Sequence, residues 1–235
     1  MLLKYIHLFM INRIYFISGL GADRRVFRKL VFPEHFELVY LDWISPVPNE
    51  TLESYANRIA TNIDTSAPFY LIGLSFGGML ATEIAKRLTP IHTFLISSIP
   101  VFKNLPWYYR MAGRASLQKM LPLSLIKTSN SVGLKFMGAT TLEDRTLLKQ
   151  LVKDSDARFI KWALTCILTW RNMERPKNVT HIHGTADSIL PIKYTKPDAV
   201  VKGGGHFMVH SNATEISKII MDKMGDTAYA NNRLP

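Results

Sequence analysis

The sequence FYLIGLSFGGMLATEIAKRL, residues 69–88, joins a short apolar run to a helical pattern with one serine between them. The run FYLIGL at 69–74 has the length of a buried strand, and the apolar spacing over 76–88 predicts a helix that ends before Thr89-Pro90. Ser75 therefore lies in a sharp strand-to-helix turn within the pattern G-x-S-x-G, where the flanking glycines relieve crowding. We expect the Ser75 hydroxyl to be presented at the carboxyl end of this strand, beside a helix N-terminus that favours negative charge.

Strands and helices alternate on both sides of this unit. Apolar, β-branched and aromatic runs predict strands at 12–18, 36–41, 92–97, 179–183 and 199–202, and helical patterns cover 24–30, about 51–63 and 212–224. The alternation predicts the α/β class, with a mostly parallel sheet flanked by helices. A chain of 235 residues is long enough for one well-buried core, so we expect a single domain over residues 1–235.

The alternation is interrupted at residues 101–177, which contain no good strand. Helical patterns appear there at 106–120, 142–153 and 156–171. An insertion at this point of the chain lies beyond the carboxyl ends of the strands, where open α/β sheets bind ligands. We therefore interpret residues 101–177 as a helical cap. Residues 1–11 are interpreted as an extra strand or a loose leader, and the last ten residues as a loose tail.

A serine hydroxyl needs a base to take its proton, and His206 is the best candidate. It follows the last predicted strand in the glycine-rich stretch KGGGHF, which can bring an imidazole over the sheet edge. His92, His181 and His183 lie in or beside strands, where packing or backbone bonding is the expected role. His210 begins the final helix and remains the alternative base.

The base in turn needs a carboxylate to fix its tautomer, and Asp187 is the candidate. It lies in HGTADSILP, immediately after the fifth predicted strand, at the same end of the sheet as Ser75 and His206. Asp198 begins the sixth strand at the opposite end and is interpreted as a turn residue. An oxyanion would be held by the backbone N–H of Phe76, after the serine, and by that of Leu20 in the loop Ser18-Gly19-Leu20-Gly21.

These motifs resemble those of the α/β-hydrolase superfamily. The stretches GLSFG, HGTADSILP and GGGHF are similar to its nucleophile elbow, acid loop and histidine loop, and they occur in the same chain order. Many members have a histidine where this chain has Ser18, so the oxyanion loop departs from the pattern. The resemblance implies a small, capped serine hydrolase that cleaves a carboxylic ester or thioester through an acyl-enzyme on Ser75.

Fold and triad do not choose a substrate. Trp43 and Trp107 are candidate substrate contacts, and several other aromatic and apolar cap residues either line an acyl pocket or form the cap's own core: Tyr108, Tyr109, Phe136, Met137, Trp162 and Trp170. Two alternatives to a hydrolase of a small-molecule acyl substrate stay open. One is a binding or sensing protein of the same fold with little turnover, and the other is an acyltransferase.

Composition limits the partners. The net charge is +11, but nine of those charges lie in the cap, spread at helical intervals without a Lys/Arg block, so we expect no nucleic acid. The basic cap is either a solvated face or a surface for an anionic substrate or carrier.

No apolar run is long enough for an integral membrane segment, and the single Cys166 fits a reduced cytoplasmic setting. We expect no cofactor and no metal, because the histidines of HIH at 181–183 have no carboxylate cluster nearby. Nothing in the sequence indicates an oligomeric state.

Overall fold

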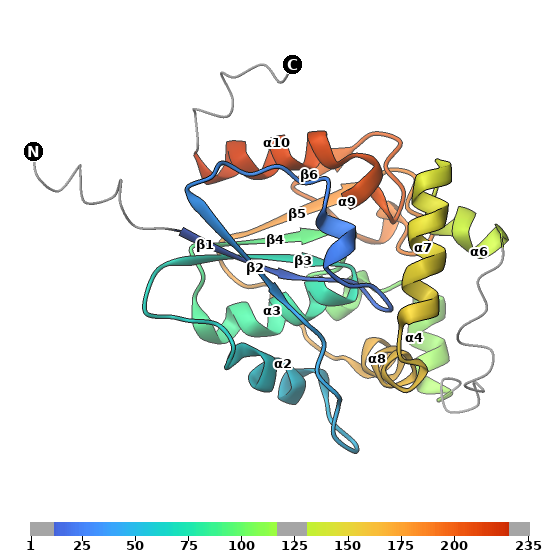
Figure 1. Ribbon diagram of the computed structural model, residues 1–235. Helices are drawn as coiled ribbons and strands as arrows, with labels where there is room; N and C mark the ends of the chain where they lie inside the picture. Colours follow the sequence, from blue (N-terminus) through green and yellow to red (C-terminus); the bar gives the residue numbers. More distant parts are fainter. Residues whose placement is uncertain (1–11, 117–130, 226–235) are drawn as a thin grey trace, which may run out of the picture.

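A six-stranded parallel sheet forms the centre of the computed structural model, which describes residues 12–116 and 131–225 (Figure 1). The strand order is β2-β1-β3-β4-β5-β6, and every neighbouring pair is parallel. The strands are β1 (Asn12–Ile17), β2 (Phe36–Leu41), β3 (Phe69–Leu74), β4 (His92–Ile96), β5 (Val179–Gly184) and β6 (Ala199–Val201). The α/β class is therefore confirmed, and all carboxyl ends of the strands meet at one edge.

Successive side chains of a strand point to opposite faces of the sheet, and apolar side chains on both faces are buried. In β1, Ile14 and Phe16 belong to one apolar cluster, and Tyr15 and Ile17 to the other. The first cluster is covered by η1 (Arg24–Phe27), α9 (Met208–Ser211) and α10 (Ala213–Met224). The second is covered by α2 (Leu52–Ala60) and α3 (Phe76–Leu88), which lie together on the opposite side of the sheet (Figure 1).

The described helices of residues 101–177 lie at the carboxyl ends of the strands (Figure 1). The helices described in this segment are α4 (Trp107–Arg114), α6 (Ser131–Phe136), α7 (Leu142–Asp154) and α8 (Ala157–Thr169), and the short η2 (Phe102–Asn104) precedes them. Leucines of α7 pack into the first apolar cluster, and Phe159, Ala163 and Cys166 of α8 pack into the second. The cap therefore extends both halves of the core instead of forming a core of its own.

One predicted helix is shorter in the structure, and the sequence did not predict some short helices. The stretch 24–30 forms only the short η1, which closes with an i+3 bond from Arg28 N to Arg25 O. The final helix is preceded by the separate turn α9, and a further short helix, η4 (Ile192–Tyr194), follows the Asp187 loop. Residues 1–11 and the last ten residues lie outside the described ranges, as does the end of the helix predicted at 106–120. No helix within the described ranges is long and apolar enough to cross a membrane.

Candidate functional site

Ser75 lies in the predicted strand-to-helix turn between β3 and α3. Its backbone angles are φ 51° and ψ −117°, a conformation that non-glycine residues rarely adopt and that costs about 1–3 kcal/mol. Neighbouring glycines make the turn possible, because a Cβ on Gly77 would lie 2.2 Å from the carbonyl oxygen of Ser18 and one on Gly73 would lie 2.5 Å from that of Gly77. Ser98 supports the turn by donating its hydroxyl to the Ser75 carbonyl at 2.6 Å.

His206 faces Ser75 from the loop after β6. Its Nε2 lies 2.9 Å from Ser75 Oγ, and its Nδ1 lies 2.8 Å from Asp187 Oδ2. Because the carboxylate accepts from Nδ1–H, the neutral ring has its lone pair on Nε2, where it accepts the serine proton. His206 and Asp187 are both buried.

Asp187 is held by the backbone that follows it. Its Oδ1 accepts the N–H groups of Ile189 and Leu190 at 2.9 and 2.8 Å, which leaves Oδ2 for His206. Burial works to raise the pKa of the carboxyl, but His206 and the Leu190 amide outweigh it and bring the pKa below its ordinary value. Asp187 is therefore ionised at neutral pH.

Four other histidines make their hydrogen bonds away from Ser75. His210, the alternative base, bonds through Nδ1 to Asp144 of α7 at 2.7 Å and accepts at Nε2 from Arg28 at 3.3 Å. His92 lies 2.7 Å from the Thr180 hydroxyl, and His181 and His183 contact each other within the sheet. Asp198 directly precedes β6 and accepts the backbone N–H of His181 at 2.7 Å. His7 lies outside the described residues.

The loop after β1 passes close to Ser75. A Cβ on Gly19 would lie 3.5 Å from that of Ser75, and Leu20 and Phe76 line the same cavity as Ser75. The loop is fixed at the carbonyl of Ala22, which accepts from the Ser18 hydroxyl and from Trp43 Nε1, each at 2.9 Å. Ser18 thus has a structural task in this loop, where many members of the superfamily have a histidine.

An apolar cavity of about 420 Å³ opens over Ser75 and His206, between the sheet and the cap. Its other walls come from the elbow helix, the loop after β4, the cap and the Asp187 loop: Leu20, Phe76, Met79, Ile99, Leu105, Tyr109, Ala112, Met137, Leu164, Ile167, Leu168, Ile189 and Leu190. A second apolar hollow of about 210 Å³ shares Leu20, Ser75, Met137 and His206 with the first and extends toward α7. No lysine, arginine, aspartate or glutamate is among the described residues that line either space.

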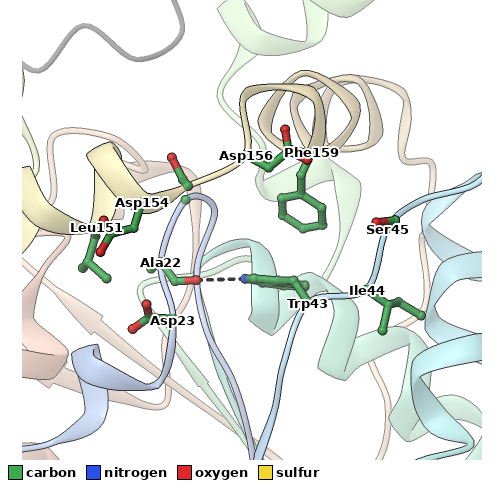
Figure 2. A pocket seen from close by; sticks show the side chains of 11 residues that line it. Ala22, Asp23, Trp43, Ile44, Ser45, Leu151, Asp154, Asp156 and Phe159 are labelled. Atoms are coloured by element: carbon green, nitrogen blue, oxygen red, sulfur yellow. Dashed lines mark hydrogen bonds between the residues drawn. The ribbon is translucent and has the colours of Figure 1, made fainter.

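The two tryptophans expected at the substrate do not line these spaces. Trp43 lies beside a separate hollow of about 310 Å³ on the outer side of the loop, where its indole reaches the Ala22 carbonyl (Figure 2). Trp107 is 58% exposed and packs edge-on against Tyr108. Large aromatic residues near a site often contact ligands, but indole rings also support loops or remain at the surface.

Comparisons with known proteins identify the family of this chain. A model of the alpha/beta hydrolase family matches residues 14–219. The chain belongs to the alpha/beta hydrolase family. A search of curated protein sequences finds no match.

Several solved structures share the fold of this chain. A lipase-esterase related protein from Clostridium acetobutylicum has 17% identity and a TM-score of 0.65, over 91% of this chain and 95% of that one. A thermophilic esterase from Thermogutta terrifontis has 14% identity and a TM-score of 0.63, over 92% and 90%. The enol-lactonase from Burkholderia xenovorans has 14% identity and a TM-score of 0.64, over 92% of each chain. At these identities the likeness concerns the fold.

Several residues of the candidate site could not be recognised from the sequence. Ser98 gave no signal, because a serine after a strand is common. Leu164, Ile167 and Leu168 line the cavity from α8, but their spacing is also that of a buried helix face. Among the aromatic and apolar cap residues, Tyr109 and Met137 line the cavity, whereas Trp170 is buried with its indole on Glu83. Among the described residues, no cluster of three or more His, Cys, Asp or Glu could hold a metal ion.

Proposed function

We propose that this alpha/beta hydrolase cleaves carboxylic esters or thioesters with apolar substituents, with Ser75 as nucleophile, His206 as general base and Asp187 as the carboxylate that orients the base. The observation that supports this most strongly is the unbroken row of hydrogen bonds from Asp187 through His206 to Ser75. Each bond is within the distance required for proton transfer between a nucleophile and its base.

The proposed reaction has two halves. Ser75 Oγ attacks the carbonyl carbon of the substrate while its proton moves to His206 Nε2, and Asp187 stabilises the imidazolium that forms. The oxyanion is held by the backbone N–H groups of Leu20 and Phe76. His206 then gives its proton to the leaving oxygen or sulfur, which leaves an acyl-enzyme on Ser75. Water then attacks this ester while His206 takes its proton, and His206 returns that proton to Ser75 Oγ as the acid leaves.

The cavity lining supports an uncharged, apolar acyl group. Transfer of a charged chain into a space lined by leucine, isoleucine and methionine would be costly without a partner, whereas apolar surface gains about 25 cal/mol per Å² buried. The volume of about 420 Å³ is in the usual range for small-molecule sites. The basic cap stays a candidate docking surface for an anionic carrier outside the cavity, and the cytoplasm stays our proposed compartment.

The direct test is hydrolysis of p-nitrophenyl esters of increasing acyl length. We expect turnover by the native chain and a loss of about 10⁴-fold or more in kcat for Ser75→Ala. Leu164→Trp should fill the larger space and lower kcat/KM for long acyl chains while short ones react normally. Thr169→Trp, on an exposed position of the same helix, is the matched control.

Other outcomes would identify the alternatives. One equivalent of product without turnover would favour the sensing protein. Transfer of the acyl group to an added alcohol in preference to water would favour the acyltransferase. A rate of acyl-carrier hydrolysis that does not change with salt would remove the carrier role of the basic cap.

A further inference from the structure

Two buried histidines of β5 lie near the loop of Asp187 and have no part in the proposed reaction. The side chains of His181 and His183 point to the same face of the strand, and both residues are fully buried. His181 Nε2 lies 3.0 Å from His183 Nδ1. His183 Nε2 lies 2.7 Å from the Leu190 carbonyl oxygen and 3.4 Å from Asp187 Oδ2.

The direction of each hydrogen bond in this row follows from its last acceptor. A carbonyl oxygen only accepts, so His183 carries its proton on Nε2. Burial lowers the pKa of both histidines, in His181 to about 3, so both rings are neutral and His183 Nδ1 is a lone pair. His181 therefore donates from Nε2, and its Nδ1 accepts from the Thr195 hydroxyl at 3.3 Å.

The row ends on the loop that carries the proposed acid. Leu190 accepts from His183 at its carbonyl and donates from its N–H to Asp187 Oδ1 at 2.8 Å. The Nε2–H of His183 also faces Asp187 Oδ2, the oxygen that accepts from His206. With the opposite tautomer, a lone pair would face both the carbonyl and the carboxylate. The tautomer of His183 thus decides whether this loop is held or repelled.

We infer that His183 is a positioning residue for the proposed hydrolase, with its tautomer fixed by His181, and that it holds the Asp187–Leu190 loop so that Asp187 Oδ2 meets His206 Nδ1. The inference rests on the proposed function for its catalytic meaning. The structural part of the inference does not depend on turnover: His183 is neutral, carries its proton on Nε2 and is bound to the acid loop. Because Ile189 and Leu190 also line the apolar cavity, the same contact holds part of the substrate wall.

Nitrogen NMR of the native chain with labelled histidines tests the tautomer directly. We expect His183 and His181 to be neutral with the proton on Nε2 throughout about pH 5–8. We also expect a downfield proton resonance from His206 Nδ1–H on Asp187. A proton on Nδ1 of His183, or titration of His183 within this range, would overturn the inference.

Variants separate positioning from packing. His183→Leu should shift the His206 Nδ1–H resonance and slow fluorophosphonate labelling of Ser75 about tenfold, the worth of one hydrogen bond. His183→Gln keeps a donor near the Nε2 position and should restore both. His92→Leu removes another strand histidine, bonded to Thr180 and not to the acid loop, and should leave both unchanged.

The inference is wrong if folded His183→Leu matches the native chain in both readouts, or if His183→Gln is no better than His183→Leu. If His183→Leu does not fold, the inference is still tested by the tautomer of His183 in the native chain and by comparing both readouts of His183→Gln with those of the native chain. Failure of the proposed function looks different, because the native chain would then not label at Ser75 while the tautomer result stood.

Discussion

At the scale of single residues, the proposed chemistry depends on backbone atoms that side chains hold in place. The carbonyl of Ala22 accepts from two donors, the Ser18 hydroxyl and the Trp43 indole, and this fixes the loop that carries Leu20. Trp43 also packs against the rings of Phe76 and Phe159, so its ring has a second task in the core. An oxyanion donor acts at full strength only when it is held in place before the reaction.

Trp43→Phe keeps most of the ring and removes the hydrogen bond to Ala22. We expect kcat for ester hydrolysis to fall about tenfold with little change in KM, because the loss concerns an interaction made in the transition state. Trp162→Phe is the matched control, since its indole donates at the same distance of 2.9 Å to the Glu50 carbonyl, away from the loop. Equal kcat values for Trp43→Phe and the native chain would show that Ser18 alone holds the loop.

At the scale of elements, α7 fastens the cap to the rest of the chain at both its ends. Arg25 pairs with Asp154 at its carboxyl end, and Arg28 and Lys29 pair with Glu143 near its amino end. A buried contact joins the same end to α9, where His210 meets Asp144 at 2.7 Å. Since α9 begins two residues after His206, the cap and the histidine loop are mechanically joined.

Asp144→Asn should weaken this junction by about 2 kcal/mol, because it leaves the buried His210 with a poorer partner. We expect a lower free energy of unfolding in urea and faster proteolysis within the cap. Glu143→Gln removes a neighbouring charge whose pairs are half exposed and should have little effect. Similar losses for the two variants would mean that the surface pairs, and not His210, fasten the cap.

At the scale of the whole molecule, stability should depend on pH through the buried histidines. Burial lowers the pKa of His181 to about 3, whereas an unfolded histidine titrates near 6.5. Between these two pH values His181 is protonated in the unfolded state and neutral in the folded state. The free energy of unfolding therefore falls as the pH decreases from about 6.5 toward 3. Urea unfolding at several pH values should show this slope, and His181→Gln should reduce it. An unchanged slope in the variant would contradict this assignment.

Local patterns predicted most of the fold. The bounds of β2, β3 and α3 match the predicted ranges, because buried strands and an amphipathic helix leave clear periodic signals. The meeting of Ser75, Asp187 and His206 was predictable as well, since parallel strands bring their carboxyl ends to one edge. The cavity walls were not, because a leucine that faces a cavity and one that faces a core have the same spacing. The task of His183 depends on a distance across a loop, which no spacing encodes.

The most direct test of the central claim is covalent labelling of the native chain with a fluorophosphonate, followed by mass mapping of the adduct. We predict one label per chain on Ser75, and none on Ser75→Ala. Ser98→Ala, which removes the neighbouring hydroxyl that supports the turn, should still be labelled. Folded native protein that takes no label, or takes it at another residue, would contradict the assignment of Ser75 as the nucleophile.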